Sequence, residues 1–290
     1  MEFNKSKKIL VIGRAGMDIY PEPPGTKISE VKNFSTHLGG SAANTCVALS
    51  QLGVQSDLLT CVSEDAIGEY IFEKLREFNV GSNLCRRVEN KFQTQVAVVE
   101  TILKNNQSIL YRNNSCDLQL NKNDIDNINF QDYSAVFISG TALSSNPSRD
   151  AVFYATQKAS SLSIPLIIDM DYRPYNWESD EIKSNIYKKI MNEMDIIIGN
   201  DLEFNIADNS TEGFQLAKSF INEKPSIIIY KMGEKGSTVI TKEKEQNFGI
   251  FKVEAIKPTG AGDAFNGGFI SSILQGYSLE DSIKRGSANA

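Results

Sequence analysis

The chain has 290 residues, of which 41% are hydrophobic and 23% charged, with a formal net charge of −6. This composition is typical of a folded protein with a sizeable core and excludes a disordered or fibrous chain. The acidic balance also argues against non-specific attraction to nucleic acid or to an anionic membrane.

Short apolar runs recur along the chain and predict strands. Because they are apolar at every position, they suit strands buried on both faces, as in a parallel sheet. From the third run onward they are spaced by roughly 30 residues, the length of a strand–helix–strand unit. The predicted strands are Ile9–Ile12, Leu58–Val62, Ala135–Ile138, Leu166–Ile168, Ile196–Ile198 and Ile227–Ile229.

Helical stripes lie between several of these strands. Apolar residues at helical spacing span residues 42–49, 71–78 and 265–273, and Ser41 is a candidate cap for the first of these helices. Alternating strands and helices predict an α/β fold, a doubly wound and mostly parallel sheet sandwiched by helices.

Two extended stretches interrupt the alternation, and we interpret them as a small β-sheet lid over a site. They are Val31–His37 and Gln93–Arg112, the second with a polar turn at residues 104–107. We interpret residues 1–290 as a single domain whose lid segments cover about residues 14–38 and 92–117.

The numbers of histidines and cysteines limit the kinds of catalytic and metal site that the chain can form. His37 is the only histidine, which argues against Ser-His-Asp or Cys-His catalysis, and we interpret it as a lid or loop residue. The four cysteines form no C-x-x-C pair, so reduced thiols are expected. Without a targeting segment or a bilayer-length apolar run, the sequence predicts a cytoplasmic protein.

The most informative segment is a glycine-rich turn that runs directly into an amphipathic helix, at residues 258–269. Glycines let the backbone approach a ligand, and free N–H groups at a helix start favour an anion. Asp263 lies at this helix start, so the segment combines amides that hold negative charge with a carboxylate that accepts a hydroxyl proton. An ordinary capped helix is the alternative. The segment is neither a Rossmann fingerprint nor a P-loop.

Two further glycine turns precede this motif. One comprises Gly39–Asn44 at a helix start, and the other comprises Gly13–Asp18 after the first strand. In α/β sheets ligands gather at such strand ends. Together with residues 258–269, these motifs resemble the ribokinase (PfkB) family of carbohydrate kinases over essentially the whole chain.

The resemblance implies a doubly wound α/β fold with a β-sheet lid, ATP as phosphoryl donor and Mg²⁺ as cofactor. Asp263 would deprotonate the sugar hydroxyl, and Gly260, Ala261 and Gly262 would form the anion hole. The sugar would be bound by Asp18, Gly39, Gly40 and Asn44. Asn200 and Glu203, in an N-x-x-E motif, would organise the water shell of Mg²⁺. The expected nucleotide contacts are Lys231, Gly233, Gly236, Ser237 and Thr259, although residues 231–237 also fit a simple hairpin turn.

A closer resemblance within the family is to a kinase that phosphorylates a sugar acid. A carboxylate needs a cation, and Arg is its favoured bidentate partner. Arg14, Arg112 and Arg173 are the candidates, with Arg112 first. The alternative is that one or more of them only brace the lid or pair with Asp171. The alternatives are a kinase for 2-dehydro-3-deoxygluconate or a neutral sugar such as fructose, and a catalytically silent sugar or nucleotide sensor.

Three further expectations follow from the resemblance. Lys257 stands where many members have an Asp beside a monovalent cation, and its ammonium is expected to replace that cation. The chain ends at Ala290, and we expect the C-terminal end of the family fold, beside the adenine, to be missing. A projecting lid has exposed edges, which makes a homodimer through the lid an expected assembly.

Overall fold

The structure is a computed structural model that describes residues 3–4, 7–89, 91–102, 107–174, 176–253 and 259–290. Lys257 and residues 104–106 of the expected polar turn lie outside these residues. Within the described part of the chain, no helix is long and apolar enough to cross a membrane.

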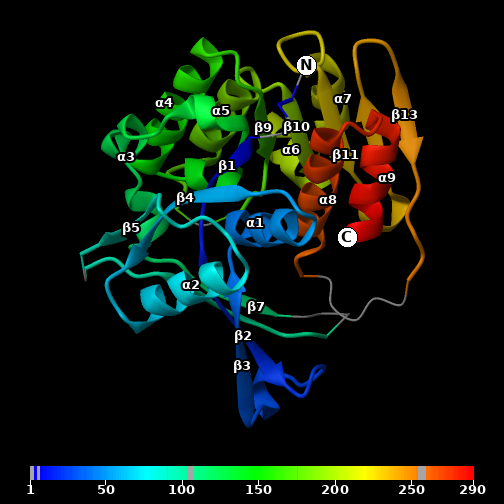
Figure 1. Ribbon diagram of the computed structural model, residues 1–290. Coiled ribbons are helices and arrows are strands. Elements are labelled where there is room, and N and C mark those ends of the chain that lie inside the picture. Colours follow the sequence, from blue (N-terminus) through cyan, green and yellow to red (C-terminus); the bar gives the residue numbers. More distant parts are fainter. Residues whose placement is uncertain (1–2, 5–6, 90, 103–106, 175, 254–258) are drawn as a thin grey trace.

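A large twisted sheet occupies the centre of the molecule (Figure 1). Among the described residues it has nine strands in the order β13-β12-β11-β10-β9-β8-β1-β4-β5, and all neighbours are parallel except β11–β12 and β12–β13. Its strands are β1 (Lys8–Ile12), β4 (Ser56–Ser63), β5 (Cys85–Val88), β8 (Tyr133–Ser139), β9 (Leu166–Asp169), β10 (Ile196–Asn200), β11 (Ile227–Lys231), β12 (Ser237–Ile240) and β13 (Glu245–Phe248). All six strands expected from the apolar runs are confirmed.

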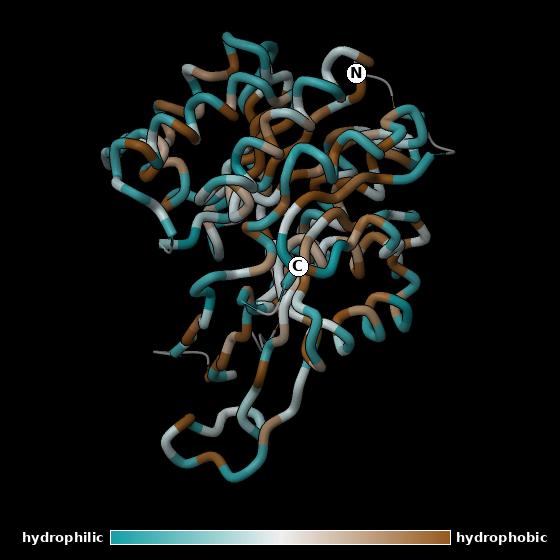
Figure 2. The backbone as a smooth tube through the Cα atoms, turned by 90° about the vertical axis from the view of Figure 1, so that its left-hand side faces the viewer, coloured by the Kyte–Doolittle hydropathy of each residue, from teal (hydrophilic) through white to brown (hydrophobic). Residues whose placement is uncertain are grey.

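Helices cover both faces of this sheet (Figure 1). In β1, Ile9 and Val11 belong to one buried cluster, while Leu10 and Ile12 belong to the other. Figure 2 shows the resulting pattern of hydrophobic strands between more polar helices. One face carries α1 (Ser41–Gln51), α2 (Ala66–Glu77), α8 (Ala261–Gln275) and α9 (Leu279–Asn289), and the other carries α3 (Lys122–Asp126), α4 (Ser148–Ser161), α5 (Asp180–Met191), α6 (Asp201–Asp208) and α7 (Gly213–Phe220). The predicted doubly wound fold is therefore confirmed.

A smaller sheet projects from one side of the large one (Figures 1 and 2). Its order is β3-β2-β6-β7, with β2 parallel to β6 and the other pairs antiparallel. The strands are β2 (Gly16–Glu22), β3 (Asn33–Gly39), β6 (Gln95–Val99) and β7 (Ser108–Tyr111). They lie in or next to the two stretches that interrupt the strand–helix alternation.

The start of α1 differs from the expected capped helix. Gly40, not Ser41, precedes the helix, and its φ of 92° suits glycine. A Cβ at Gly40 would lie 2.5 Å from the carbonyl oxygen of Arg14. Ser41 is the first helical residue, and its hydroxyl donates to Asp171 instead of capping the helix. The predicted Ser41 cap is wrong because the glycine pair turns the chain one residue earlier.

Close packing of α1 against α8 gives a stability prediction. A Cβ at Gly267 would lie 2.3 Å from Cβ of Ala48, so Gly267→Ala must push the two helices apart. We expect the variant to lose about 1–3 kcal/mol of folding free energy, measured by denaturant unfolding. Turnover should fall as well, because α1 and α8 carry Asn44 and Asp263. Gly249→Ala is the matched control, since among the described residues nothing lies within 4 Å of the added Cβ. Equal unfolding midpoints for the two variants would contradict the prediction.

Candidate active site

The start of α8 lines three cavities in the described structure, and the two larger ones are relevant to the site. Gly260 and Asp263 line a cavity of about 360 Å³ beneath the small sheet, and Ala261 and Gly262 line one of about 350 Å³ beside β11 and β12. Gly260 precedes the helix with a φ of 93°, and no side chain among the described residues caps it. The N–H groups of this turn are therefore available to an anionic ligand.

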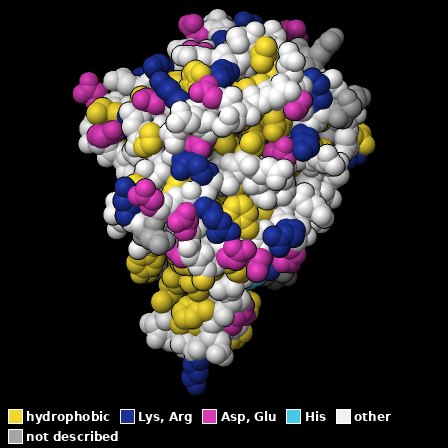
Figure 3. All heavy atoms as spheres, turned by 60° about the vertical axis from the view of Figure 1, so that its left-hand side comes forward, with side chains coloured by type: hydrophobic (Ala, Val, Ile, Leu, Met, Phe, Trp, Pro, Cys, Tyr) yellow, Lys and Arg dark blue, Asp and Glu magenta, His cyan; other side chains and the backbone are white. Residues whose placement is uncertain are grey.

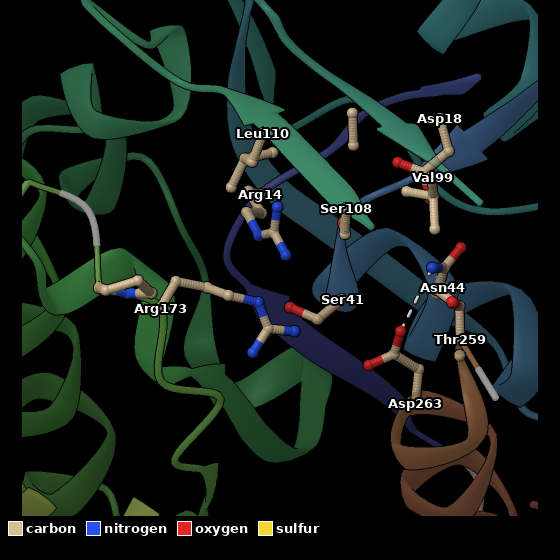
Figure 4. A pocket seen from close by; sticks show the side chains of 14 residues that line it. Arg14, Asp18, Ser41, Asn44, Val99, Ser108, Leu110, Arg173, Thr259 and Asp263 are labelled. Atoms are coloured by element: carbon tan, nitrogen blue, oxygen red, sulfur yellow. Dashed lines mark hydrogen bonds between the residues drawn. The ribbon is translucent and has the colours of Figure 1, made fainter. Parts of the chain in front are cut away.

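Asp263 faces the first cavity from α8, opposite Asn44 on α1 (Figure 4). The side-chain amide of Asn44 donates to Oδ2 of Asp263 at 3.2 Å. Burial, and then the negative charges of Asp171 and Asp169, raise the pKa of Asp263 to about 8. A carboxylate with a pKa in this range is suited to accept a proton near neutral pH.

The first cavity contains most of the residues expected to bind the sugar. Asp18, Gly40 and Asn44 line it, and the hydroxyl of Tyr20 donates to Oδ2 of Asp18 at 3.1 Å. Gly39 is not among the lining residues within the described chain. A Cβ at that position would lie 2.1 Å from Oδ1 of Asp18, so Gly39 makes room for the Asp18 carboxylate.

The three arginines expected to bind a carboxylate differ sharply in their surroundings. Arg112, the first candidate, is buried in an ion pair with Asp117 and donates to the carbonyl oxygen of Thr141 at 3.0 Å. It is not among the residues that line either cavity in the described structure. Ranking Arg112 first is therefore not supported, because Asp117 already neutralises the guanidinium.

Arg173 lines the first cavity and pairs with Asp171 at 2.9 Å, so both interpretations of this arginine apply. Burial alone would raise the pKa of Asp171, but Arg173 and Arg14, together with hydroxyl donors, hold it below its ordinary value. Those donors are Ser41 and Ser139, which connect the pair to α1 and β8.

Arg14 also points into the first cavity (Figure 4). Its Nη1 donates to the neutral amide oxygen of Gln95, and within the described chain no carboxylate lies at ion-pair distance from it. Its buried Nε has no hydrogen-bond partner among the described residues. Burial lowers the pKa of Arg14, and the negative charge of Asp171 offsets this only in part, while Arg112 and Arg173 lower the pKa further. Among the described residues, Arg14 thus presents a buried guanidinium without an ion-pair partner to whatever fills the cavity.

The second cavity contains most of the expected nucleotide contacts. Lys231, Gly233, Gly236 and Ser237 line it, together with Asn200. Thr259 instead lines the first cavity, beside Asp263. Its assignment as a nucleotide contact is not supported, because Thr259 is not among the described residues that line the cavity beside β11 and β12.

Asn200 and Glu203 form a capping box at the start of α6. The Asn200 side chain accepts from the Glu203 N–H at 3.0 Å, and the Glu203 carboxylate accepts from the N–H groups of Asn200 at 2.8 Å and Tyr172 at 3.1 Å. Burial and the charge of Asp169 raise the pKa of Glu203. In the part of the chain that the structure describes, no group of three or more acidic, His or Cys side chains is arranged to hold a metal directly. The arrangement fits a hydrated cation held through water, which is how Mg²⁺ is usually bound.

Sequence reasoning missed two parts of the site. Gln95, which holds Arg14, lies on an ordinary strand with no motif to mark it. Asp169 bonds Lys231 at 3.1 Å and also accepts from Asn266 of α8. Asp169 and Asp171 stand in an acidic run directly after a predicted strand, a signal that points to this edge of the sheet.

Comparisons with known proteins agree with the resemblance to the PfkB family. A family model described as "pfkB family carbohydrate kinase" matches residues 6–290. A 5-dehydro-2-deoxygluconokinase from Photobacterium profundum is 36% identical over 289 residues, covering 97% of this chain and 87% of that protein. One from Clostridium perfringens is 34% identical, covering 100% and 88%. A crystal structure of a putative ribokinase II from E. coli, in complex with ATP and Mg²⁺, matches with a TM-score of 0.87 at 20% identity, covering 97% and 91%.

Proposed function

The chain belongs to the pfkB family of carbohydrate kinases, and we propose that it transfers the γ-phosphoryl group of ATP to a sugar acid. The proposed acceptor is the 6-hydroxyl of 5-dehydro-2-deoxy-D-gluconate, in line with the names of its relatives. The sugar acid would occupy the cavity beneath the small sheet, and ATP would occupy the cavity beside β11 and β12.

The observation that carries the proposal is the buried guanidinium of Arg14, which forms no ion pair among the described residues and lies in the same cavity as Asp263. A buried cation without a direct ion-pair partner is costly, and an anionic substrate relieves that cost. A neutral sugar would not. We therefore assign the substrate carboxylate to Arg14, with Arg173 at the rim, and the reacting hydroxyl to Asp263.

The reaction follows from these positions. The substrate hydroxyl oxygen forms a bond to the γ-phosphorus, the bond from that phosphorus to the β-phosphate oxygen breaks, and ADP leaves with the electron pair. The hydroxyl proton passes to Asp263. N–H groups at Ala261 and Gly262 face the transferred group and stabilise its charge.

Mg²⁺ would neutralise charge on the ATP phosphates, and Asn200 and Glu203 would orient its water shell. The small sheet would act as a lid, since Val99 of β6 and both Ser108 and Leu110 of β7 line the sugar cavity. Closure over the substrate would exclude water from the phosphoryl group.

A substrate panel tests the proposal. Purified protein with MgATP is assayed for ADP release with 5-dehydro-2-deoxy-D-gluconate, 2-dehydro-3-deoxygluconate, fructose or no sugar. We expect the highest kcat/KM for the first compound and little ADP without sugar. Preference for either other sugar would assign the chain to that substrate. Tight binding of a sugar without ADP release would favour a sensor.

We also propose a cytoplasmic location and a homodimer. All four cysteines are free thiols, and the cytoplasm is the compartment that keeps thiols reduced and supplies ATP.

The surface that supports the homodimer is on the projecting small sheet. Hydrophobic side chains gather there (Figure 3), and Phe34, Ile109 and Tyr111 are 48%, 40% and 60% exposed. A second copy could cover this surface. Sedimentation at micromolar concentration should then give twice the 32.1 kDa chain mass, and a mass of one chain would reject the dimer.

A further inference from the structure

Lys231 occupies a special position in the sheet. It ends β11, directly opposite Asn200 at the end of the neighbouring strand β10. β9, the next strand along, ends at Asp169, and Nζ of Lys231 lies 3.1 Å from Oδ2 of this aspartate. The Asn266 side chain on α8 donates to the same oxygen. Asp169 therefore holds the lysine beside the helix that carries Asp263.

The ammonium of Lys231 reaches the first turn of α8. A Cβ built on Gly262 would lie 3.6 Å from Nζ of Lys231, so with glycine at this position the lysine faces the helix backbone directly. Both residues line the nucleotide cavity. On the other side of the same turn lies Asp263, in the sugar cavity. The first turn of α8 therefore lies between the two cavities, where a phosphoryl group would pass from one to the other.

The charges around Lys231 keep it cationic. Burial alone would lower its pKa, but the carboxylates of Asp169, Glu203 and Asp263 raise it above the ordinary value. Three carboxylates face one ammonium here, so an approaching phosphate meets strong repulsion unless cations offset it. Among the described residues that line the nucleotide cavity, Lys231 is the one with a cationic side chain, and this side chain reaches the α8 turn.

We propose that Lys231 is a catalytic residue that contacts the γ-phosphoryl group during transfer, positioned by Asp169 and Asn266 against the first turn of α8. The inference rests on the proposed kinase reaction and goes beyond an assignment of Lys231 to nucleotide binding. As the bond to ADP breaks and the bond to the substrate oxygen forms, the ammonium stabilises charge on the transferred oxygens and keeps its own protons. Its effect is therefore greatest in the transition state.

The first test is steady-state kinetics of Lys231→Met. We expect kcat to fall about a hundredfold, as for loss of one transition-state donor, while KM for the sugar acid changes less than about threefold. Lys231→Arg keeps a cation and should recover part of the loss. Lys158→Met is the matched control. It removes a lysine of α4 whose Nζ lies 2.7 Å from Oδ1 of Asp126 on α3. It should behave as wild type.

A binding measurement separates this role from simple nucleotide affinity or structural support. Calorimetry would measure the affinity for two ligands: ADP alone, and the combination of ADP, aluminium fluoride and sugar acid, which mimics the transferring phosphoryl group. Wild type should bind the mimic far more tightly than ADP. In Lys231→Met the affinity for the mimic should fall at least about tenfold, while the affinity for ADP stays nearly unchanged.

Two results would overturn the inference. Equal losses of affinity for ADP and the mimic would make Lys231 a nucleotide-binding residue, and wild-type kcat in Lys231→Met would make it a brace for Asp169. Thermal unfolding of each variant shows whether it is folded, and Lys231→Arg tests the role if the Met variant is not. A wild-type protein inactive on every sugar would reject the proposed function instead, so the two failures are distinguishable.

Discussion

Asp263→Asn is expected to lower kcat by about 10³-fold while leaving the affinity for the sugar acid within about threefold of wild type. The carboxamide keeps the shape of the side chain and its contact with Asn44, but it cannot accept the proton of the reacting hydroxyl. Steady-state kinetics with saturating MgATP gives kcat, and calorimetry with the sugar acid alone gives the affinity. A variant within tenfold of wild-type turnover would remove Asp263 from the proposed mechanism.

The pH profile gives a second signature of the same group. Because burial and the charges of Asp171 and Asp169 raise the pKa of Asp263 to about 8, the free enzyme carries a largely protonated base at pH 6. kcat/KM should therefore rise with pH up to about 8 and then level off. In the pH profile of kcat, which reports the enzyme with its ligands bound, the rise should occur at lower pH. Bound cations favour the charged carboxylate of Asp263 and so lower its pKa.

The Asp263→Asn variant should also be more stable than wild type. In the unfolded chain Asp263 titrates near its ordinary value of 3.8, well below its folded value of about 8. The folded protein thus binds the proton of Asp263 more tightly, so this residue lowers the stability of the wild type as pH rises from about 4 to 8. The Asn variant lacks this contribution. The difference in unfolding free energy should grow with pH by at most about 1.4 kcal/mol per unit, reach a plateau above pH 8 and vanish near pH 4.

The sequence predicts the fold well because its signals are local. Each apolar strand is buried on both faces, so the run of β-branched residues is sufficient to mark it. The positions of Asp263 and Asn44 follow for a similar reason. Glycine turns place both residues at helix starts, and the topology brings α1 and α8 side by side.

The parts of the site that escaped prediction depend on pairings that no motif marks. Asp117 follows Arg112 by five residues, but nothing in the sequence indicates that it folds back on the guanidinium, and nothing near Arg14 reveals that its partner is the distant, neutral Gln95 rather than an acid. Which arginine is free to bind substrate is decided by these partners, not by the motif around each arginine. Thr259 likewise lines the cavity beneath the small sheet, because a turn can face either of two cavities.

Arg14→Met should have the largest effect on substrate choice. Truncating one member of a buried charge pair costs about 2–5 kcal/mol, so kcat/KM for the sugar acid should fall by about 30-fold to 5,000-fold. The analogue with the carboxylate reduced to an alcohol has no charge to pair with Arg14, and its kcat/KM should change little. The ratio of the two values, measured with both compounds on each enzyme, is the decisive quantity.

Gln95→Glu tests the same charge without changing the arginine. The substitution is nearly isosteric and places a carboxylate on the guanidinium of Arg14. We expect KM for the sugar acid to rise about tenfold with kcat almost unchanged, because the substrate then competes with an internal anion. Arg112→Met, in contrast, should mainly reduce stability by leaving Asp117 buried and unpaired. If Arg14→Met weakens the acid and its reduced analogue equally, or Gln95→Glu leaves KM at the wild-type value, the substrate carboxylate does not bind Arg14.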